Sequence, residues 1–195
     1  PVLWIGTRGG GLERRMTGTD SCIHFSRRDN NGTSSDTITA LAAGADGKLW
    51  IGTPSGIETY DEKTGQFTRW PHLNSAVTTL YVDSGGEVWV GTSSGLMRVS
   101  NSTGKKTHYA ASSTQGICSD DVKAIADQDG RYIWVATTAG VSRLDKLYGT
   151  WHCFQHDDDD PKSLSSSFTF HVSVDRSSNV WIASDNGLNK LTPRA

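Results

Sequence analysis

Five short hydrophobic stretches recur along the chain, and each begins with a tryptophan followed by alternating large and small side chains. They read Trp-Ile-Gly-Thr or a close variant and begin at Trp4, Trp50, Trp89, Trp134 and Trp181. Successive tryptophans are 46, 39, 45 and 47 residues apart. Self-similarity at such a period is typical of repeat architectures. We therefore interpret the chain as one structural unit repeated five times.

Each tryptophan is followed by other hydrophobic positions at fixed distances. A glycine and an aliphatic residue come six residues later, or seven in the first copy, and an aromatic residue comes 20 or 21 residues later. These aromatic residues are Phe25, Trp70, Tyr109 and Phe154. From each of them to the next tryptophan, the distance varies between 19 and 27 residues. Because loops tolerate insertions and packed elements do not, this pattern separates a scaffold from its variable loops.

The polar and apolar pattern predicts four short strands in each unit. The first strands are β-prone segments at residues 38–42, 77–82, 122–126 and 168–174, each followed by a turn rich in Asp, Gly and Ser. The second strand carries the tryptophan, the third starts at the glycine-aliphatic pair, and the fourth ends at the aromatic residue. The Gly or Ala two positions after the tryptophan lies on the same strand face, which indicates close packing between sheets.

Four antiparallel strands in a repeated unit of about 40 to 47 residues describe a blade of a β-propeller. We therefore predict an all-β fold with about four and a half blades within a single propeller region, residues 1–195. The predicted blades are residues 37–71, 76–110 and 121–155, with partial blades at 1–27 and 167–195. Partial blades expose strand edges, so the chain is a piece of a larger propeller, its ends complete each other, or two chains form a homodimer. We favour the first of these alternatives.

The motif Asp-x-Gly-x-aliphatic-Trp-Ile-Gly-Thr-x-x-Gly-Leu, with a later Thr-Gly-x-Phe turn, resembles the two-component regulator propeller repeat. Residues 46–67 are the closest copy, and residues 156–181 resemble the usual connection between blades. The resemblance implies a seven-bladed propeller in the periplasmic or extracytoplasmic sensor region of a bacterial, often hybrid, sensor histidine kinase. It also implies an oligosaccharide or polysaccharide breakdown product as ligand, and the rest of a larger sensor protein as partner.

Composition excludes some classes of partner. The net charge is −2, and the basic residues form no cluster on a periodic face, so no nucleic-acid partner is expected. No run of 18 apolar residues occurs, and we expect no direct membrane contact in this segment. No catalytic motif such as GxSxG, HExxH or a Walker loop occurs, so we predict a binding protein rather than an enzyme.

Neither cysteines nor acidic residues form a recognisable metal site, and we expect no metal or cofactor. Cys22, Cys118 and Cys153 have no CxxC spacing, and their odd number leaves at least one thiol unpaired. Cys22 and Cys153 precede the closing aromatic residues, where we expect small buried side chains. The acidic run at residues 157–160 is interpreted as a solvated loop, with a calcium site as the alternative.

Candidate ligand-binding residues are those at which the repeats stop agreeing. The first residue of the turn after the tryptophan strand is small and neutral in three repeats, but it is Arg8 and Asp185 in the other two. Asn186, which follows Asp185, adds an amide. Arg8 offers a rigid fork of donors suited to carboxylate, sulfate or sugar hydroxyl groups. His171 stands where other first strands have Ala or Thr, and His72 lies in the variable loop 71–76.

Three functions fit this scaffold, because function is determined by sites that a fold merely carries. The first is a ligand-binding sensor region, which we favour. The second is a propeller lyase or hydrolase, for which His171 and Asp185 would have to converge with perturbed pKa values. The third is a protein-protein interaction platform, which would present an apolar patch or a free strand edge.

Overall fold

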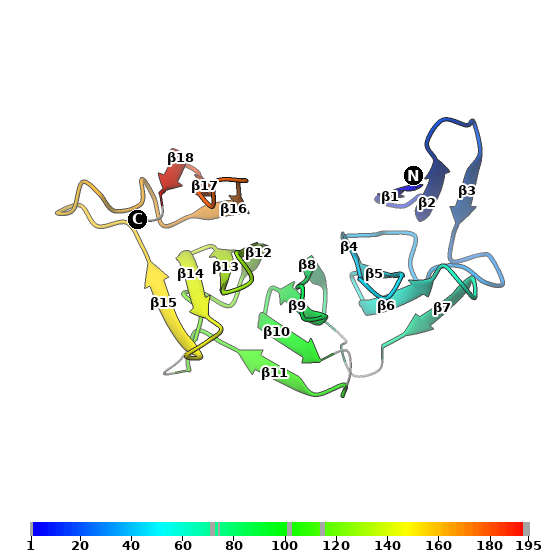
Figure 1. Cartoon of the computed structure of the whole chain (residues 1–195), viewed down its shortest axis with the longest axis horizontal. Helices are drawn as coiled ribbons and strands as arrows, with labels where there is room; N and C mark the ends of the chain where they lie inside the picture. Colours follow the sequence, from blue (N-terminus) through cyan, green and yellow to red (C-terminus); the bar gives the residue numbers. More distant parts are fainter. Residues whose placement is uncertain (1, 71–72, 74, 101–102, 114–115, 193–195) are drawn as a thin grey trace. The chain divides into compact units, whose positions relative to one another are not determined.

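The structure is a computed structural model that describes residues 2–70, 73, 75–100, 103–113 and 116–192. Its strands fall into two units, residues 1–82 and 83–195. Figure 1 shows short strands that follow one another along each sheet. No helix occurs in the described part of the chain, so none there could span a membrane. The predicted all-β class is confirmed.

The first unit contains two sheets and a further strand, all built from consecutive segments. One sheet has the order β1-β2-β3 and the other the order β4-β5-β6-β7. The strands are β1 (Val2–Gly6), β2 (Leu12–Met16), β3 (Cys22–Phe25), β4 (Ala40–Ala43), β5 (Lys48–Thr53), β6 (Gly56–Asp61), β7 (Gln66–Arg69) and β8 (Val77–Val82). All the strand pairs within these two sheets are antiparallel.

The second unit repeats the same plan. In it β9, β10 and β11 are consecutive neighbours, and the following sheets have the orders β12-β13-β14-β15 and β16-β17-β18. The strands are β9 (Glu87–Thr92), β10 (Gly95–Ser100), β11 (Lys106–Tyr109), β12 (Val122–Gln128), β13 (Tyr132–Thr137), β14 (Gly140–Asp145), β15 (Thr150–Phe154), β16 (Thr169–Val174), β17 (Val180–Ser184) and β18 (Gly187–Leu191). The predicted order of tryptophan strand, glycine-led strand and aromatic strand is therefore observed.

Close packing at the glycine two positions after the tryptophan is also observed. A Cβ atom on Gly52 would lie 2.6 Å from Cγ1 of Val77 on β8. A Cβ atom on Gly6 would lie 2.6 Å from Cγ2 of Ile38, which precedes β4. Both distances are shorter than real Cβ contacts, so any larger side chain would push the two layers apart. The small residue therefore determines how closely one sheet approaches the next.

The central tryptophans form the core of the sheets. Trp50, Trp89 and Trp134 are 0%, 0% and 1% exposed. A buried indole N–H needs an acceptor. Nε1 of Trp89 donates to Asp83 at 3.2 Å, and Nε1 of Trp134 donates to Gln128 at 2.8 Å. Asp83 and Gln128 each lie six residues before their tryptophan, and Gly44 occupies that position before Trp50. Nε1 of Trp50 is therefore buried without an acceptor among the described residues.

We expect the substitution Gly44→Asp to raise the free energy of unfolding by about 1 kcal/mol, because the new carboxylate would accept a hydrogen bond from Trp50. A Cβ atom at this position would lie 2.6 Å from Oδ1 of Asp46 and 3.2 Å from the carbonyl oxygen of Lys48. The exposed Asp46 side chain, which accepts the Lys48 amide at 3.2 Å, must turn away to make room. Urea denaturation measures the change. Gly44→Ala is the matched control, and equal stabilisation by Ala would show that the hydrogen bond is not the cause.

The predicted burial of two cysteines is wrong. Cys22 and Cys153 are both exposed, and Cys22 is a free thiol. They lie on β3 and β15, the outer strands of their sheets, where most side chains are exposed. Cys153 instead forms a disulfide with Cys118, in the loop between β11 and β12. The odd cysteine count therefore leaves Cys22 as the unpaired thiol.

Candidate functional site

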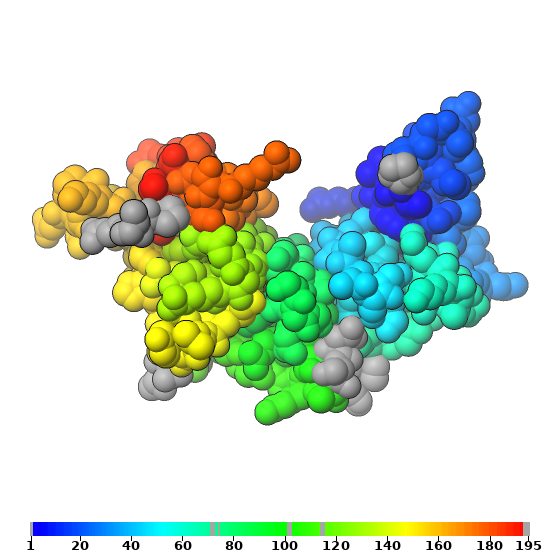
Figure 2. Space-filling view, in the orientation of Figure 1, coloured from blue at the N-terminus to red at the C-terminus, as the bar shows by residue number. Residues whose placement is uncertain are grey.

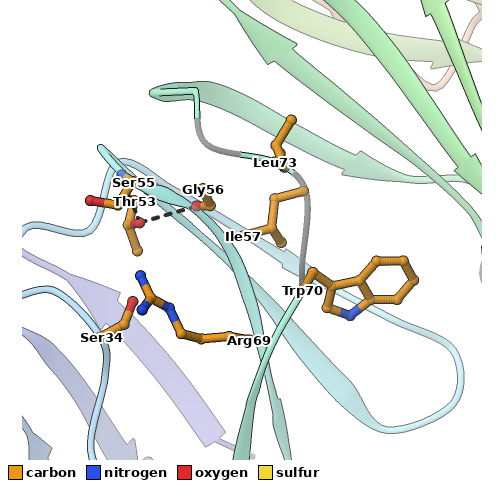
Figure 3. Close-up of a pocket in the computed structure, with 8 residues that line it drawn as sticks. All are labelled: Ser34, Thr53, Ser55, Gly56, Ile57, Arg69, Trp70 and Leu73. Carbon is orange, nitrogen blue, oxygen red and sulfur yellow. Dashed lines mark hydrogen bonds between the residues drawn. The ribbon is translucent and has the colours of Figure 1, made fainter.

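A small pocket of about 210 Å³ lies on the first unit, where three segments meet. The segments are the loop before β4, the turn between β5 and β6, and the end of β7 with Trp70 and Leu73. The pocket is lined by Ser34, Thr53, Ser55, Gly56, Ile57, Arg69, Trp70 and Leu73 (Figure 3). Ser34 and Leu73 lie in the variable loops between an aromatic strand and the next tryptophan strand, and Ser55 lies in the turn after the tryptophan strand.

The turn between β5 and β6 holds its shape through Thr53. Its hydroxyl donates to the carbonyl oxygen of Gly56 at 3.1 Å and accepts from the amide of Ser55 at 3.1 Å. Gly56 has a φ of 130°, and a Cβ atom there would lie 2.0 Å from the carbonyl oxygen of Leu73. Only glycine fits such a position. The turn therefore presents the exposed Ser55 from a fixed backbone.

Glu58 on β6 fixes the loop that carries Ser34. Its side chain is 1% exposed, and its carboxylate accepts the Ser34 amide at 3.0 and 3.2 Å. Burial raises the pKa of Glu58, although the Ser34 hydrogen bonds and the charge of Arg69 act in the opposite direction. In other sheets Ser142 and Asn189 accept loop amides in the same way, at 2.8 and 2.9 Å. Glu58 is thus a positioning residue.

Arg69 supplies the charge of the pocket. It lies directly opposite Glu58 in the β6–β7 register, and its side chain is exposed. None of the ion pairs in the described part of the chain involves Arg69. Figure 3 shows the guanidinium group pointing toward Ser34 and the turn that holds Thr53 and Ser55. Within the part of the chain that the structure describes, its donors therefore remain available to an incoming group.

Trp70 borders the pocket, but its indole ring does not face the pocket. In Figure 3 the indole points away from the guanidinium group of Arg69. The ring instead packs on Trp50, with a distance of 4.9 Å between ring centroids. The apolar side of the pocket consists of Ile57 and Leu73, both buried. The pocket is therefore a polar recess on a hydrophobic floor rather than an aromatic stacking platform.

These groups suit recognition by hydrogen bonds. Arg69 carries up to five N–H donors in a planar fork, and the hydroxyl groups of Ser34 and Ser55 can donate or accept. The buried carboxylate of Glu58 behind Arg69 partly balances its charge, which makes a neutral hydroxyl-bearing group an acceptable ligand as well as a carboxylate. At about 210 Å³ the pocket is smaller than typical ligand pockets, so it would hold one group of a larger ligand.

Arg8, one of the residues predicted from the sequence, is not part of this pocket. It lies in the turn between β1 and β2, forms an isolated β-bridge with Thr37, and has an exposed side chain. The amides of Gly9 and Gly11 in the same turn donate to the carbonyl oxygen of Asp36 at 2.8 and 2.7 Å. The turn is therefore held by its backbone, and the role of Arg8 in binding stays a prediction.

The remaining predicted residues that the structure describes lie in the second unit. Asp185 and Asn186 form the exposed turn between β17 and β18, where Nδ2 of Asn186 donates to the carbonyl oxygen of Ser165 at 3.1 Å. His171 is exposed on β16, opposite Ala183. No hydrogen bond or ion pair between His171 and Asp185 occurs in the described residues. His72 lies outside the described residues.

Sequence reasoning missed Ser34, Ser55, Glu58 and Arg69. A signal for Arg69 was available, because the residue before each closing aromatic differs between repeats: His24, Arg69, His108 and Cys153. The two histidines in this set are bound to the scaffold. His24 contacts the carbonyl oxygen of Gly10, and His108 contacts that of Ser94 at 3.0 Å. Among the described contacts, Arg69 has no hydrogen bond to a backbone carbonyl oxygen, whereas both histidines contact one.

The acidic run at residues 157–160 shapes its own loop. Oδ1 of Asp157 accepts the amide of Asp159 at 3.0 Å, and Oδ1 of Asp160 accepts the amide of Lys162 at 2.9 Å. All four side chains are exposed. Figure 2 shows this loop, coloured yellow-orange, projecting from the surface of the second unit. Within the described residues no group of acidic, histidine or cysteine side chains is arranged to hold a metal ion.

Comparison with solved protein structures identifies the class of fold. The extracellular domain of BT4673 from B. thetaiotaomicron matches with a TM-score of 0.84 and 22% identity over 100% of this chain and 26% of that chain. The extracellular domain of BT3049 from the same organism, assigned to a hybrid two component system, matches with a TM-score of 0.68 and 21% identity, over 97% and 32%. Virginiamycin B lyase from Staphylococcus aureus matches with a TM-score of 0.71 and 12% identity, over 100% and 67%.

The fold is therefore part of a β-propeller, as the sequence predicts. The chain spans about a quarter of the length of the BT4673 domain. The family model described as two component regulator propeller matches residues 28–55 and 72–94, which confirms the resemblance inferred from the repeated motif. No match to a curated protein was found.

Proposed function

We propose that residues 1–195 belong to the ligand-binding sensor region of a bacterial two-component regulatory protein. The match to the two component regulator propeller family supports this proposal, as do the similar extracellular domains of BT4673 and BT3049. The disulfide between Cys118 and Cys153 supports a location outside the cytoplasm, because disulfides persist in oxidising compartments. The kinase and the rest of the propeller would be supplied by other parts of a longer protein.

The ligand of this sensor is an oligosaccharide, and one of its groups binds in the pocket beside Arg69. The observation that carries this assignment is the recess lined by Arg69, Ser34 and Ser55, in which no ion pair of the described residues engages the guanidinium group. A sugar presents several hydroxyl groups in fixed directions, which suits a preformed set of donors and acceptors. The rest of the ligand would extend along the neighbouring variable loops.

We expect the substitution Arg69→Ala to weaken oligosaccharide binding by about 10- to 100-fold, because hydrogen bonds to a charged donor contribute about 1.5–3 kcal/mol. Isothermal titration calorimetry measures this change for a sugar selected from neutral and uronate-containing oligosaccharides. Lys63→Ala is the control, because Lys63 is an exposed cation in the turn between β6 and β7, at the other end of the sheet.

Three results would separate the alternatives for this site. Unchanged affinity in Arg69→Ala together with weaker affinity in Arg8→Ala would move the site to the turn between β1 and β2. Weaker affinity in Lys63→Ala would indicate a general charge effect. Cleavage of a bound sugar by the wild-type chain would favour the enzyme alternative, which the similarity to a lyase fold makes worth testing.

A further inference from the structure

Two exposed phenylalanines lie side by side where β16 begins, in the second unit. The rings of Phe168 and Phe170 are 5.2 Å apart between centroids, with an angle of 73° between their planes, and the two residues are 41% and 48% exposed. Thr169 between them is 0% exposed, and its hydroxyl donates to the carbonyl oxygen of Thr137 at 2.8 Å. Because side chains alternate between the faces of a strand, the anchored threonine turns both rings to the opposite face. The rings therefore form one exposed aromatic surface.

A β-bulge determines the direction of Phe170. The register of β16 with β17 shifts between Thr169 and His171, so Phe170 is the extra residue of its strand. In β12 the same irregularity makes Lys123 the extra residue. Bulges re-aim a side chain and are frequent next to active sites. Phe170 therefore has the place in its sheet that Lys123 has in the preceding sheet.

This position faces solvent in sheets that have a following neighbour as well. The side chain of Lys123 is 33% exposed although β16 lies beside β12. Thr39, the equivalent residue just before β4, is exposed although β8 lies beside β4. The other repeats thus have a polar residue at this solvent-facing position, as expected. A pair of exposed rings there has no role in packing one sheet on the next and indicates a binding surface.

Polar groups border the aromatic pair. The amide of Asp185 donates to the carbonyl oxygen of Phe168 at 3.1 Å, so the turn between β17 and β18 lies directly beside the rings. Asp185 and Asn186 in this turn are exposed. On the other side, the hydroxyl of Ser166 accepts the amide of Phe168 at 3.1 Å and fixes the backbone there. Aromatic rings beside a few polar groups are a typical lining of small-molecule sites.

We propose that Phe168 and Phe170 form a stacking platform for a neutral pyranose ring of an oligosaccharide. The apolar C–H face of the sugar would pack on the aromatic rings, and its hydroxyl groups would donate to the carboxylate of Asp185. A uronate is disfavoured here, because its charge would be repelled by Asp185. The inference rests on the proposed function for the class of ligand. It adds a second subsite, in the other unit from the polar recess beside Arg69.

Isothermal titration calorimetry with neutral hexasaccharides built from glucose, mannose, xylose or galactose tests this proposal on the intact chain. We expect Phe170→Ala and Phe168→Ala each to weaken binding of the preferred hexasaccharide by about tenfold or more, because the apolar contact area is lost. Tyr148→Ala is the matched control and should bind like the wild-type chain. Tyr148 is 71% exposed, but it lies in the turn between β14 and β15.

Two further variants separate stacking from general apolarity. Phe170→Tyr keeps an aromatic ring and should bind within about threefold of the wild-type chain. Phe170→Leu keeps an apolar side chain without a ring and should bind as weakly as Phe170→Ala. In spectra of the chain with labelled phenylalanine, the ring signals of Phe168 and Phe170 should shift on titration. The signal of Phe67, which packs within the scaffold, should not.

The outcomes distinguish this platform from the pocket beside Arg69. Weaker binding by Arg69→Ala with full binding by both phenylalanine variants would overturn the platform and leave the proposed function in place. Weaker binding by the phenylalanine variants alone would support the platform and remove the pocket. Full binding by Phe170→Leu, or tighter binding of tetramethylammonium than of any sugar, would also overturn the platform. Binding of none of the hexasaccharides would overturn both.

Discussion

Replacing Trp50 by alanine should lower the free energy of unfolding by about 3–5 kcal/mol, because it leaves a large cavity in a closely packed core. Trp50 is 0% exposed and packs on Trp70, with 4.9 Å between ring centroids. The glycine two positions later, Gly52, lets Val77 approach on the same side. The neighbouring layer therefore cannot collapse into the cavity without moving β8. Urea or thermal denaturation of the purified variant measures the loss.

Trp181→Ala provides the comparison for this experiment. Trp181 has the same place in its sheet and donates a similar indole hydrogen bond, to Asp175 at 2.9 Å, but it is only partly buried. We expect Trp181→Ala to lower the free energy of unfolding clearly less than Trp50→Ala does, because the folded chain buries less apolar surface at Trp181. A loss below about 1 kcal/mol for Trp50→Ala would contradict the assignment of the tryptophan strands to the core.

Removal of the disulfide should have the second largest effect on stability. The double substitution of Cys118 and Cys153 by serine should lower the free energy of unfolding by about 2–4 kcal/mol, because the bond closes a long loop in the unfolded chain. The two cysteines are 35 residues apart in sequence and join the β11–β12 loop to β15. Denaturation with and without a reducing agent gives the same comparison in the unmodified chain.

Cys22→Ser is the control for the disulfide experiment. Cys22 is exposed and forms no disulfide, so its replacement should change stability by less than about 0.5 kcal/mol. If the double serine variant were as stable as the wild-type chain, the loop before β12 would be held by other contacts. The hydrogen bond from the Cys118 amide to the Ser142 hydroxyl, at 2.8 Å, is the strongest candidate for such a contact.

The scaffold could be predicted from the sequence because its constraints repeat. The tryptophan, the small residue two positions later and the glycine that opens the next strand recur with fixed spacing, and each has one physical role. Trp50, Gly52 and Gly56 illustrate these roles: a buried ring, a close approach to Val77 and a turn that a Cβ atom would obstruct. A pattern repeated five times leaves little freedom in assigning such positions.

The site could not be predicted in the same way, because it depends on a position where the repeats differ. Arg69 lies on a scaffold strand, whereas the differences between repeats predict ligand contacts in turns and first strands. The predicted burial of Cys22 and Cys153 is wrong because strand periodicity alone does not tell which face of an outer strand is covered. Cys118 and Cys153 occupy unrelated positions in the repeat, so sequence spacing gave no indication that they pair.

Chemical-shift mapping by NMR tests the central claim most directly, since it locates bound ligand without any substitution. Titration with an oligosaccharide that binds the chain should shift the amide signals of Ser34 and Ser55 and the side-chain signal of Arg69 first. The signals of the turn at Lys63 should stay unchanged. Shifts confined to the turn of Arg8, or to Asp185, Asn186 and His171, would contradict the assignment of the ligand site to the pocket beside Arg69.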